Sequence, residues 1–204
     1  FSLIVLYWAY FLALVFFVLL AGILWSTVGL GVRLIEDALV WQILLYRSIS
    51  LSLFLYFVIA YRSGKSPFFQ IKSIGFPAVI AGMSLVAAYT GGVYAIQTTS
   101  VANAMLLFAT APFMAALLGW FFLRENVRIA TWIFIVIAVV GIFIMVADKS
   151  GSSKLSGSAA AIASAFGFAV FTVALRWGKS MEMLPAVFLS GLFGTMVMLS
   201  ICLL

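Results

Sequence analysis

Residues 101–123 read VANAMLLFATAPFMAALLGWFFL, an uncharged run that ends at Arg124 and Glu125. A helix needs about 20 mainly apolar residues to cross the hydrocarbon core of a bilayer, and this run is long enough. A transmembrane barrel would instead need short segments in which apolar and polar residues alternate. The run shows no such alternation, so it predicts a transmembrane helix.

Apolar runs of similar length recur along the chain. Of its residues, 67% are hydrophobic and 8% are charged, whereas a soluble domain has roughly a quarter charged residues. A soluble fold would expose several of these runs, and exposed apolar patches of that size associate or aggregate. We therefore predict an all-α, polytopic membrane helix bundle. Its seven predicted spans are Phe11–Val32, Val40–Tyr61, Gly75–Ile96, Val101–Leu123, Ile129–Ala147, Gly157–Leu175 and Leu184–Leu204.

Basic residues set the predicted orientation, because short cytoplasmic loops carry an excess of Lys and Arg. The loops after the second, fourth and sixth spans hold seven basic residues, and those after the first, third and fifth spans hold three. This places the even-numbered loops and the N-terminus in the cytoplasm, and we assign the protein to the plasma (inner) membrane. The first set is Arg62, Lys65, Lys72, Arg124, Arg128, Arg176 and Lys179; the second set is Arg33, Lys149 and Lys154.

Composition also excludes several classes of function. The chain has no histidine, which removes His-based metal sites, proton shuttles and catalytic triads. Its single cysteine, Cys202, allows no disulfide within the chain. The net charge of +6 is not clustered in a basic patch, so a nucleic-acid partner is not expected. We expect no enzyme activity, no cofactor, and no catalytic or metal-binding residues.

Arg33 and Arg176 mark a candidate internal repeat. Aligning them superposes the end of the first span on that of the sixth, and the start of the second on that of the seventh. A repeat unit of five spans is odd-numbered and forces its second copy into the membrane upside down, as in many secondary transporters. Residues 1–150 would then be the first repeat and residues 151–204 the first two spans of a truncated second repeat, which would continue to about residue 290. The open alternative is a complete seven-span protein, such as a compact transporter or a receptor.

Pro112 lies near the middle of the fourth predicted span. Its missing N–H leaves the carbonyl of Phe108 without a helical donor, so a kink is expected. A free acceptor at mid-membrane suits a binding site. Alternatively, Thr110 or a neighbouring helix satisfies this backbone and the kink only shapes packing.

Arg47 is the one charged residue well inside a predicted span. A buried intramembrane charge is expensive and marks a functional site by default, here one that meets an anionic group of a substrate. The alternative is that Arg47 extends to the interface or pairs with Glu36 or Asp37.

Other polar or amphipathic side chains at depth complete the candidate site, although each of them has a packing or interfacial role as its alternative. The predicted substrate-binding residues are Trp25, Arg47, Tyr89, Tyr94, Asn103, Thr110 and Pro112. By contrast, Gly157, Ala161, Ala165 and Ala169 follow one another at four-residue spacing and predict a smooth face on which another helix packs closely.

The order of several degenerate motifs resembles a known family. An Asn103-Ala104 pair enters a span that contains a central Pro112, Glu125 follows that span, and Gly141 stands in a Val-Val-Gly-Ile-Phe sequence. This order resembles the EamA-type domain of the drug/metabolite transporter superfamily. The likeness is best over Gly22–Val146, and Trp25 and Tyr46-Arg47 also fit it.

The resemblance implies a ten-span carrier of two inverted five-span repeats that moves small metabolites, often outward. It identifies residues 1–150 as an EamA-like repeat. The predicted function is therefore a secondary carrier or exporter for small metabolites, such as amino acids or related solutes, that works by alternating access. Its expected partners are the lipid bilayer and a small-molecule substrate, and a homodimer is left open.

Overall fold

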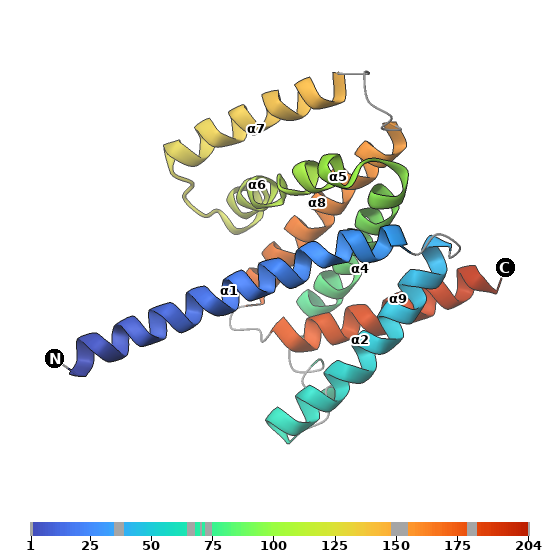
Figure 1. Ribbon diagram of the computed structural model, residues 1–204, viewed down its shortest axis with the longest axis horizontal. Coiled ribbons are helices and arrows are strands. Elements are labelled where there is room, and N and C mark those ends of the chain that lie inside the picture. Colours follow the sequence, from blue (N-terminus) through green and yellow to red (C-terminus); the bar gives the residue numbers. More distant parts are fainter. Residues whose placement is uncertain are drawn as a thin grey trace. The chain divides into compact units, whose positions relative to one another are not determined.

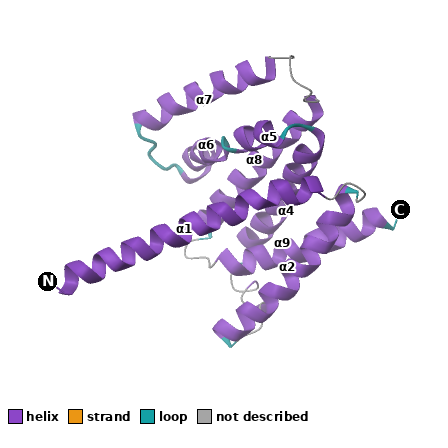
Figure 2. Cartoon of the chain, viewed as in Figure 1, coloured by secondary structure: helices purple, strands orange, loops and turns teal. Residues whose placement is uncertain are grey.

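The computed structural model describes residues 2–34, 39–64, 68–69, 71, 75–147, 155–178 and 183–203 (Figure 1). Every regular element in these ranges is helical, and no strand occurs within them (Figure 2). The prediction of an all-α chain is confirmed for this part of the protein. The helices are α1 (Ser2–Leu34), α2 (Val40–Ser63), α4 (Phe76–Thr98), α5 (Val101–Phe108), α6 (Ala111–Leu123), α7 (Ile129–Ala147), α8 (Leu155–Trp177) and α9 (Met183–Cys202).

The chain divides into two units. The first, Phe1–Asp37, contains α1, and the second, Ala38–Leu204, contains all the other helices. Helix α1 is one continuous helix of 33 residues. The remaining description of packing concerns the second unit by itself.

Six helical segments are long and apolar enough to cross a membrane, and they match six of the seven predicted spans. They are Tyr7–Val32, Val40–Arg62, Phe76–Thr98, Val101–Leu123, Leu155–Trp177 and Met183–Cys202. The remaining predicted span, the fifth, coincides with α7, which has 19 residues. At about 1.5 Å per residue α7 approaches the roughly 30 Å of the hydrocarbon core, and its membrane crossing stays a prediction.

The fourth span is broken as its proline predicted. Helix α5 ends at Phe108, the chain turns through Ala109 and Thr110, and α6 begins at Ala111 with Pro112 in its first turn. The backbone N–H of Thr110 donates to the carbonyl of Leu107 at 3.2 Å. The side-chain hydroxyl of Thr110 donates to the same carbonyl at 2.7 Å, not to that of Phe108.

Helix α8 is the centre of the second unit and packs most extensively against α4 (Figure 1). The four small residues predicted to form a smooth face on it, Gly157, Ala161, Ala165 and Ala169, are all buried. At Gly167 the backbones approach so closely that an added Cβ would lie 2.9 Å from the carbonyl oxygen of Ser84. Only small residues allow backbones to approach this closely. The resulting van der Waals contact stabilises helix pairs in a membrane, where no hydrophobic effect drives them together.

The second main contact joins α2 to α9. Leu55, Ile59 and Phe188 form a buried cluster between these helices, while Ala81, Phe171, Ala174 and Ala186 form one among α4, α8 and α9. Outside these clusters many large apolar side chains remain exposed, including Phe54 and Phe57 of α2 and Phe121 and Phe122 of α6. Exposed apolar surface on this scale suits contact with lipid.

The contact at Gly167 gives a test of the central packing. We expect Gly167→Ala to lower the free energy of unfolding by about 1–3 kcal/mol, because the backbone of α4 that the new methyl group would meet cannot move aside. The measurement is the thermal unfolding midpoint of the purified protein in detergent. Ala165→Leu on the same helix should also be destabilising, since Ala165 is fully buried.

Gly141→Ala is the matched control, because a Cβ on Gly141 of α7 would meet nothing within 4 Å. Its midpoint should equal that of the wild type or lie slightly above it, since alanine is the better helix former. Equal midpoints for Gly167→Ala and Gly141→Ala would show that α4 and α8 do not pack through Gly167.

Candidate functional site

The structure brings two of the predicted site residues, Arg47 of α2 and Tyr89 of α4, into direct contact. The central guanidinium carbon of Arg47 lies 4.2 Å from the centroid of the Tyr89 ring. This is a cation–π geometry, in which the negative face of the ring attracts the cation, and the attraction grows when water is excluded. The contact gives the Arg47 charge a fixed position within the span.

Tyr89 is itself held in place by α9. Its hydroxyl donates a hydrogen bond to the backbone carbonyl of Ser190 at 3.0 Å, and it also interacts with the hydroxyl of Ser48. A tyrosine fixed at its hydroxyl presents its ring in one orientation. The stacking surface under Arg47 is therefore preorganised by a helix that contains neither residue.

Two glycines of α9 make this arrangement sterically feasible. A Cβ on Gly194 would collide with the hydroxyls of Tyr89 and Ser48, and one on Gly191 would collide with the hydroxyl of Ser52. We call the resulting group of side chains, where α2, α4 and α9 meet, the polar junction. It consists of Arg47, Ser48, Ser52, Tyr89 and Ser190.

The three serines of the polar junction are buried, whereas Arg47 is exposed. Ser52 uses its hydroxyl to donate to the carbonyl of Ser48 at 2.8 Å, and Ser190 donates to that of Val187 at 2.7 Å. The hydroxyls of Ser52 and Ser190 thus serve the helices that carry them. Arg47 is the member of the junction with charged donors facing outward.

Arg47 has no carboxylate partner in the described part of the chain. The one acidic residue in the described ranges is Glu125, and its carboxylate pairs with the guanidinium of Arg176 at 2.9 Å. Glu36 and Asp37, the partners considered for Arg47 from the sequence, lie outside the described residues. The contact that the structure does provide for Arg47 is the Tyr89 ring.

Asn103 bridges two helices through its side-chain amide. Its Nδ2 donates to the hydroxyl of Thr99 at 3.0 Å and to the hydroxyl of Ser158 of α8 at 3.1 Å. The amide nitrogen has two hydrogens, so both donors serve the junction of α5 with α8. The structure thus gives Asn103 a packing role, and its contact with substrate stays a prediction.

The other predicted site residues lie apart from the Arg47–Tyr89 contact or are not placed relative to it. Thr110 is buried at the break between α5 and α6, and Pro112 is exposed in the first turn of α6. Tyr94 is half-buried on α4, where its carbonyl accepts the hydroxyl of Thr98 at 2.7 Å. Trp25 belongs to the α1 unit. For all four, substrate contact remains a prediction.

Sequence reasoning missed the contribution of α9 to this site. Ser190, Gly191 and Gly194 occupy about one turn of that helix, and small residues at this spacing are typical of close helix contacts in membranes. That pattern could have marked α9 as a packing partner. It could not have shown that Tyr89 is the residue that reaches Ser190.

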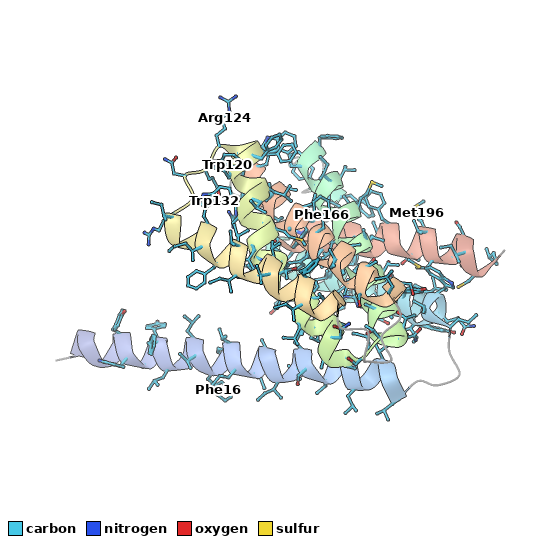
Figure 3. The ribbon with its side chains drawn as sticks, turned by 90° about the horizontal axis from the view of Figure 1, so that it is seen from above. Phe16, Trp120, Arg124, Trp132, Phe166 and Met196 are labelled. Carbon is cyan, nitrogen blue, oxygen red and sulfur yellow. The ribbon has the colours of Figure 1, made fainter. Side chains whose placement is uncertain are left out.

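Glu125 is expected from the sequence to be a structural partner of Arg124, Arg128 or a loop residue, and the structure pairs it with a residue of another helix. Arg124 adopts a left-handed conformation as the C-cap of α6, and Glu125, which follows it, reaches Arg176 near the end of α8. Nearby, the indole rings of Trp120 and Trp132 pack edge to face at 5.4 Å and connect α6 with α7 (Figure 3). These contacts tie the ends of three helices together.

Comparison with known proteins agrees with the helical architecture. Residues 4–147 match the EamA-like transporter family. Solute carrier family 35 member G1 of Mus musculus is 27% identical over 180 residues, which cover 82% of this chain and 48% of the mouse protein. The human protein of the same name is 26% identical over 202 residues, which cover 91% of this chain and 55% of its own length.

The chain thus spans about half the length of the curated relatives it matches. No solved structure matches it. The family match covers well over half of the 204 residues. It begins close to the start of α1 and ends at the last residue of α7. The chain belongs to the EamA-like transporter family, part of the drug/metabolite transporter superfamily.

Proposed function

We propose that this chain forms the first part of a carrier that moves small metabolites across the plasma (inner) membrane by alternating access between two inverted five-span repeats. The observation that carries the proposal is the family match over residues 4–147, which ends close to the predicted repeat boundary at residue 150. The named relatives are solute carriers about twice as long as this chain. Amino acids and related solutes are the substrate class we propose.

The packing within the second unit supports an inverted repeat. In a five-plus-five arrangement the second span is related by symmetry to the seventh, so a contact between these two spans would lie on the pseudo-two-fold axis. The corresponding helices, α2 and α9, make the second most extensive contact in the chain. The proposal therefore takes the contact between α2 and α9 as the meeting of two equivalent spans at this axis.

The same symmetry supplies partners for α1. The contact between α4 and α8 joins the third span to the sixth. The proposed symmetry relates the third span to the eighth and the first to the sixth, so it adds an equivalent contact between the eighth span and the first, α1. Likewise the packing of α8 on α5 and α6 has as its mate a contact between the ninth span and the first. The proposal therefore assigns α1, a unit of its own here, to spans beyond residue 204.

The polar junction lies where such a carrier holds its substrate. Arg47, Tyr89 and Ser190 are all inside membrane-spanning helices, and α2 and α9 are the pair at the proposed axis. Sites of inverted-repeat carriers lie near the midplane between the two repeats. Rocking of one repeat against the other would expose this junction to each side in turn.

The proposed orientation can be tested by cysteine labelling. In a Cys202→Ser background, Ser100→Cys probes the exposed turn between α4 and α5, and Asn126→Cys probes the exposed loop between α6 and α7. We expect a membrane-impermeant maleimide to label the Ser100→Cys variant in intact cells and the Asn126→Cys variant only after permeabilisation. The reverse pattern would place the N-terminus outside, and labelling of both from one side would refute a crossing by α5 and α6.

Transport itself can be tested without knowing the solute. The full natural protein is reconstituted into liposomes, which are incubated with a cell metabolite extract, washed and opened, and the trapped solutes are identified by mass spectrometry. We expect at least one small metabolite to accumulate in these liposomes and not in protein-free ones. If a monodisperse, reconstituted protein enriches no metabolite in either direction of loading, the carrier function is wrong.

A further inference from the structure

We propose that the polar junction binds the carboxylate of a monoanionic or zwitterionic organic solute, with the guanidinium of Arg47 as the group that pairs with it. This inference rests on the proposed function, because it assigns a substrate class to the site of that carrier. It follows from three properties of Arg47: its depth, the lack of an acidic partner for it among the described residues, and its fixed orientation.

Arg47 lies deep enough that its charge needs a partner. It stands two turns inside α2, about 10 Å along the helix from Val40. Charged side chains at such positions face a protein interior or a water-filled cavity and pair with other groups. The side chain of Arg47 is nevertheless exposed in the described structure, which leaves room for a group that the described residues do not supply.

The chain's own acids do not fill this role in the described ranges. Glu125 is engaged by Arg176, and no Asp or Glu occurs within any span. The Tyr89 ring covers one face of the guanidinium. Stacking uses the π-face of the cation and leaves the N–H groups along its edge free to donate, and this edge matches the two oxygens of a carboxylate.

The charge balance favours a monoanion over a phosphate ester. Arg47 is the one Lys or Arg well inside a span, so the junction offers a single positive charge. A carboxylate neutralises it, whereas a phosphate monoester carries about −1.5 to −2 at pH 7 and would leave negative charge in a poorly solvated place. An ammonium group elsewhere on a zwitterionic solute does not alter the pairing at Arg47.

The test follows the chemical reactivity of Arg47. The full natural protein in phosphatidylcholine liposomes is treated with phenylglyoxal, an arginine-specific reagent, and the modification rate of each arginine is read by peptide mass spectrometry. Phenylacetate at high concentration is the carboxylate probe, phenylacetamide its uncharged counterpart and phenyl phosphate the dianion. We expect phenylacetate to slow modification of Arg47 about ten-fold, as a charge-assisted bidentate pair would, and the other two to slow it little.

Arg62 and Arg124 are the internal controls, because both are exposed and lie at span ends. Their modification rates should not distinguish the three probes. Tyr89→Leu removes the stacking ring and should abolish most of the protection at Arg47. Tyr89→Phe keeps the ring, removes the hydroxyl with its contacts to Ser190 and Ser48, and should reduce the protection less.

The opposing outcomes are distinct. An Arg47 that does not react, or reacts equally fast with phenylacetate present, overturns the proposal, as does equal protection by phenyl phosphate. Slowing that appears only when phosphatidylglycerol is added to the liposomes makes the bound anion a lipid headgroup and also overturns it. Because labelling requires no transport, metabolite uptake without protection would refute the carboxylate site alone, and protection without uptake would refute the carrier alone.

Discussion

The close approach of α4 and α8 is the constraint on which the rest of the second unit depends. Lipid offers apolar side chains the same environment as a neighbouring helix does, so burial alone holds membrane helices together weakly. Close contact between the helix backbones compensates for this weak attraction, and it requires residues with small side chains. Such residues are Gly91, Gly157 and Gly167, where an added Cβ would meet the neighbouring helix or the residues at its end. With this pair fixed, α9 is positioned against α4, and the hydroxyl of Tyr89 reaches the Ser190 carbonyl.

The polar groups of the chain are divided between two roles. Several hydroxyls in the described ranges donate to carbonyls of their own helix, as Ser52, Thr98 and Thr195 do, which satisfies them without linking helices. A smaller set crosses between helices: Tyr89 to Ser190, Asn103 to Ser158, and Ser164 to the carbonyl of Ala88. These hydrogen bonds join α4 to α9, α5 to α8, and α8 to α4. They therefore add to the close contacts at the glycines of the same helices.

Most of the fold could be predicted from the sequence. A helix in a membrane must form all its backbone hydrogen bonds internally, so it appears in the sequence as a long apolar run. Pro112 likewise predicted the break between α5 and α6, since the loss of an N–H is a local effect. The site was harder to predict. Arg47 stands out by its charge, but Ser190 is one of many serines, and its value depends on the approach of α9, a tertiary contact. The pairing of Glu125 with Arg176 could not be specified from the sequence for the same reason, because the two residues are distant in sequence.

The break in the fourth span also changes the mechanics of that span. Pro112 cannot bond to the carbonyl of Phe108, so α6 is a short rod hinged to α5 at Ala109 and Thr110 instead of the continuation of one stiff rod. The far end of this rod bears Glu125, which is bound to α8 by a half-exposed ion pair. A small tilt at the hinge is therefore amplified along α6 into a displacement at that pair. The geometry is that of a lever, because a tilt at Ala109 and Thr110 would move Pro112 little and Glu125 much further.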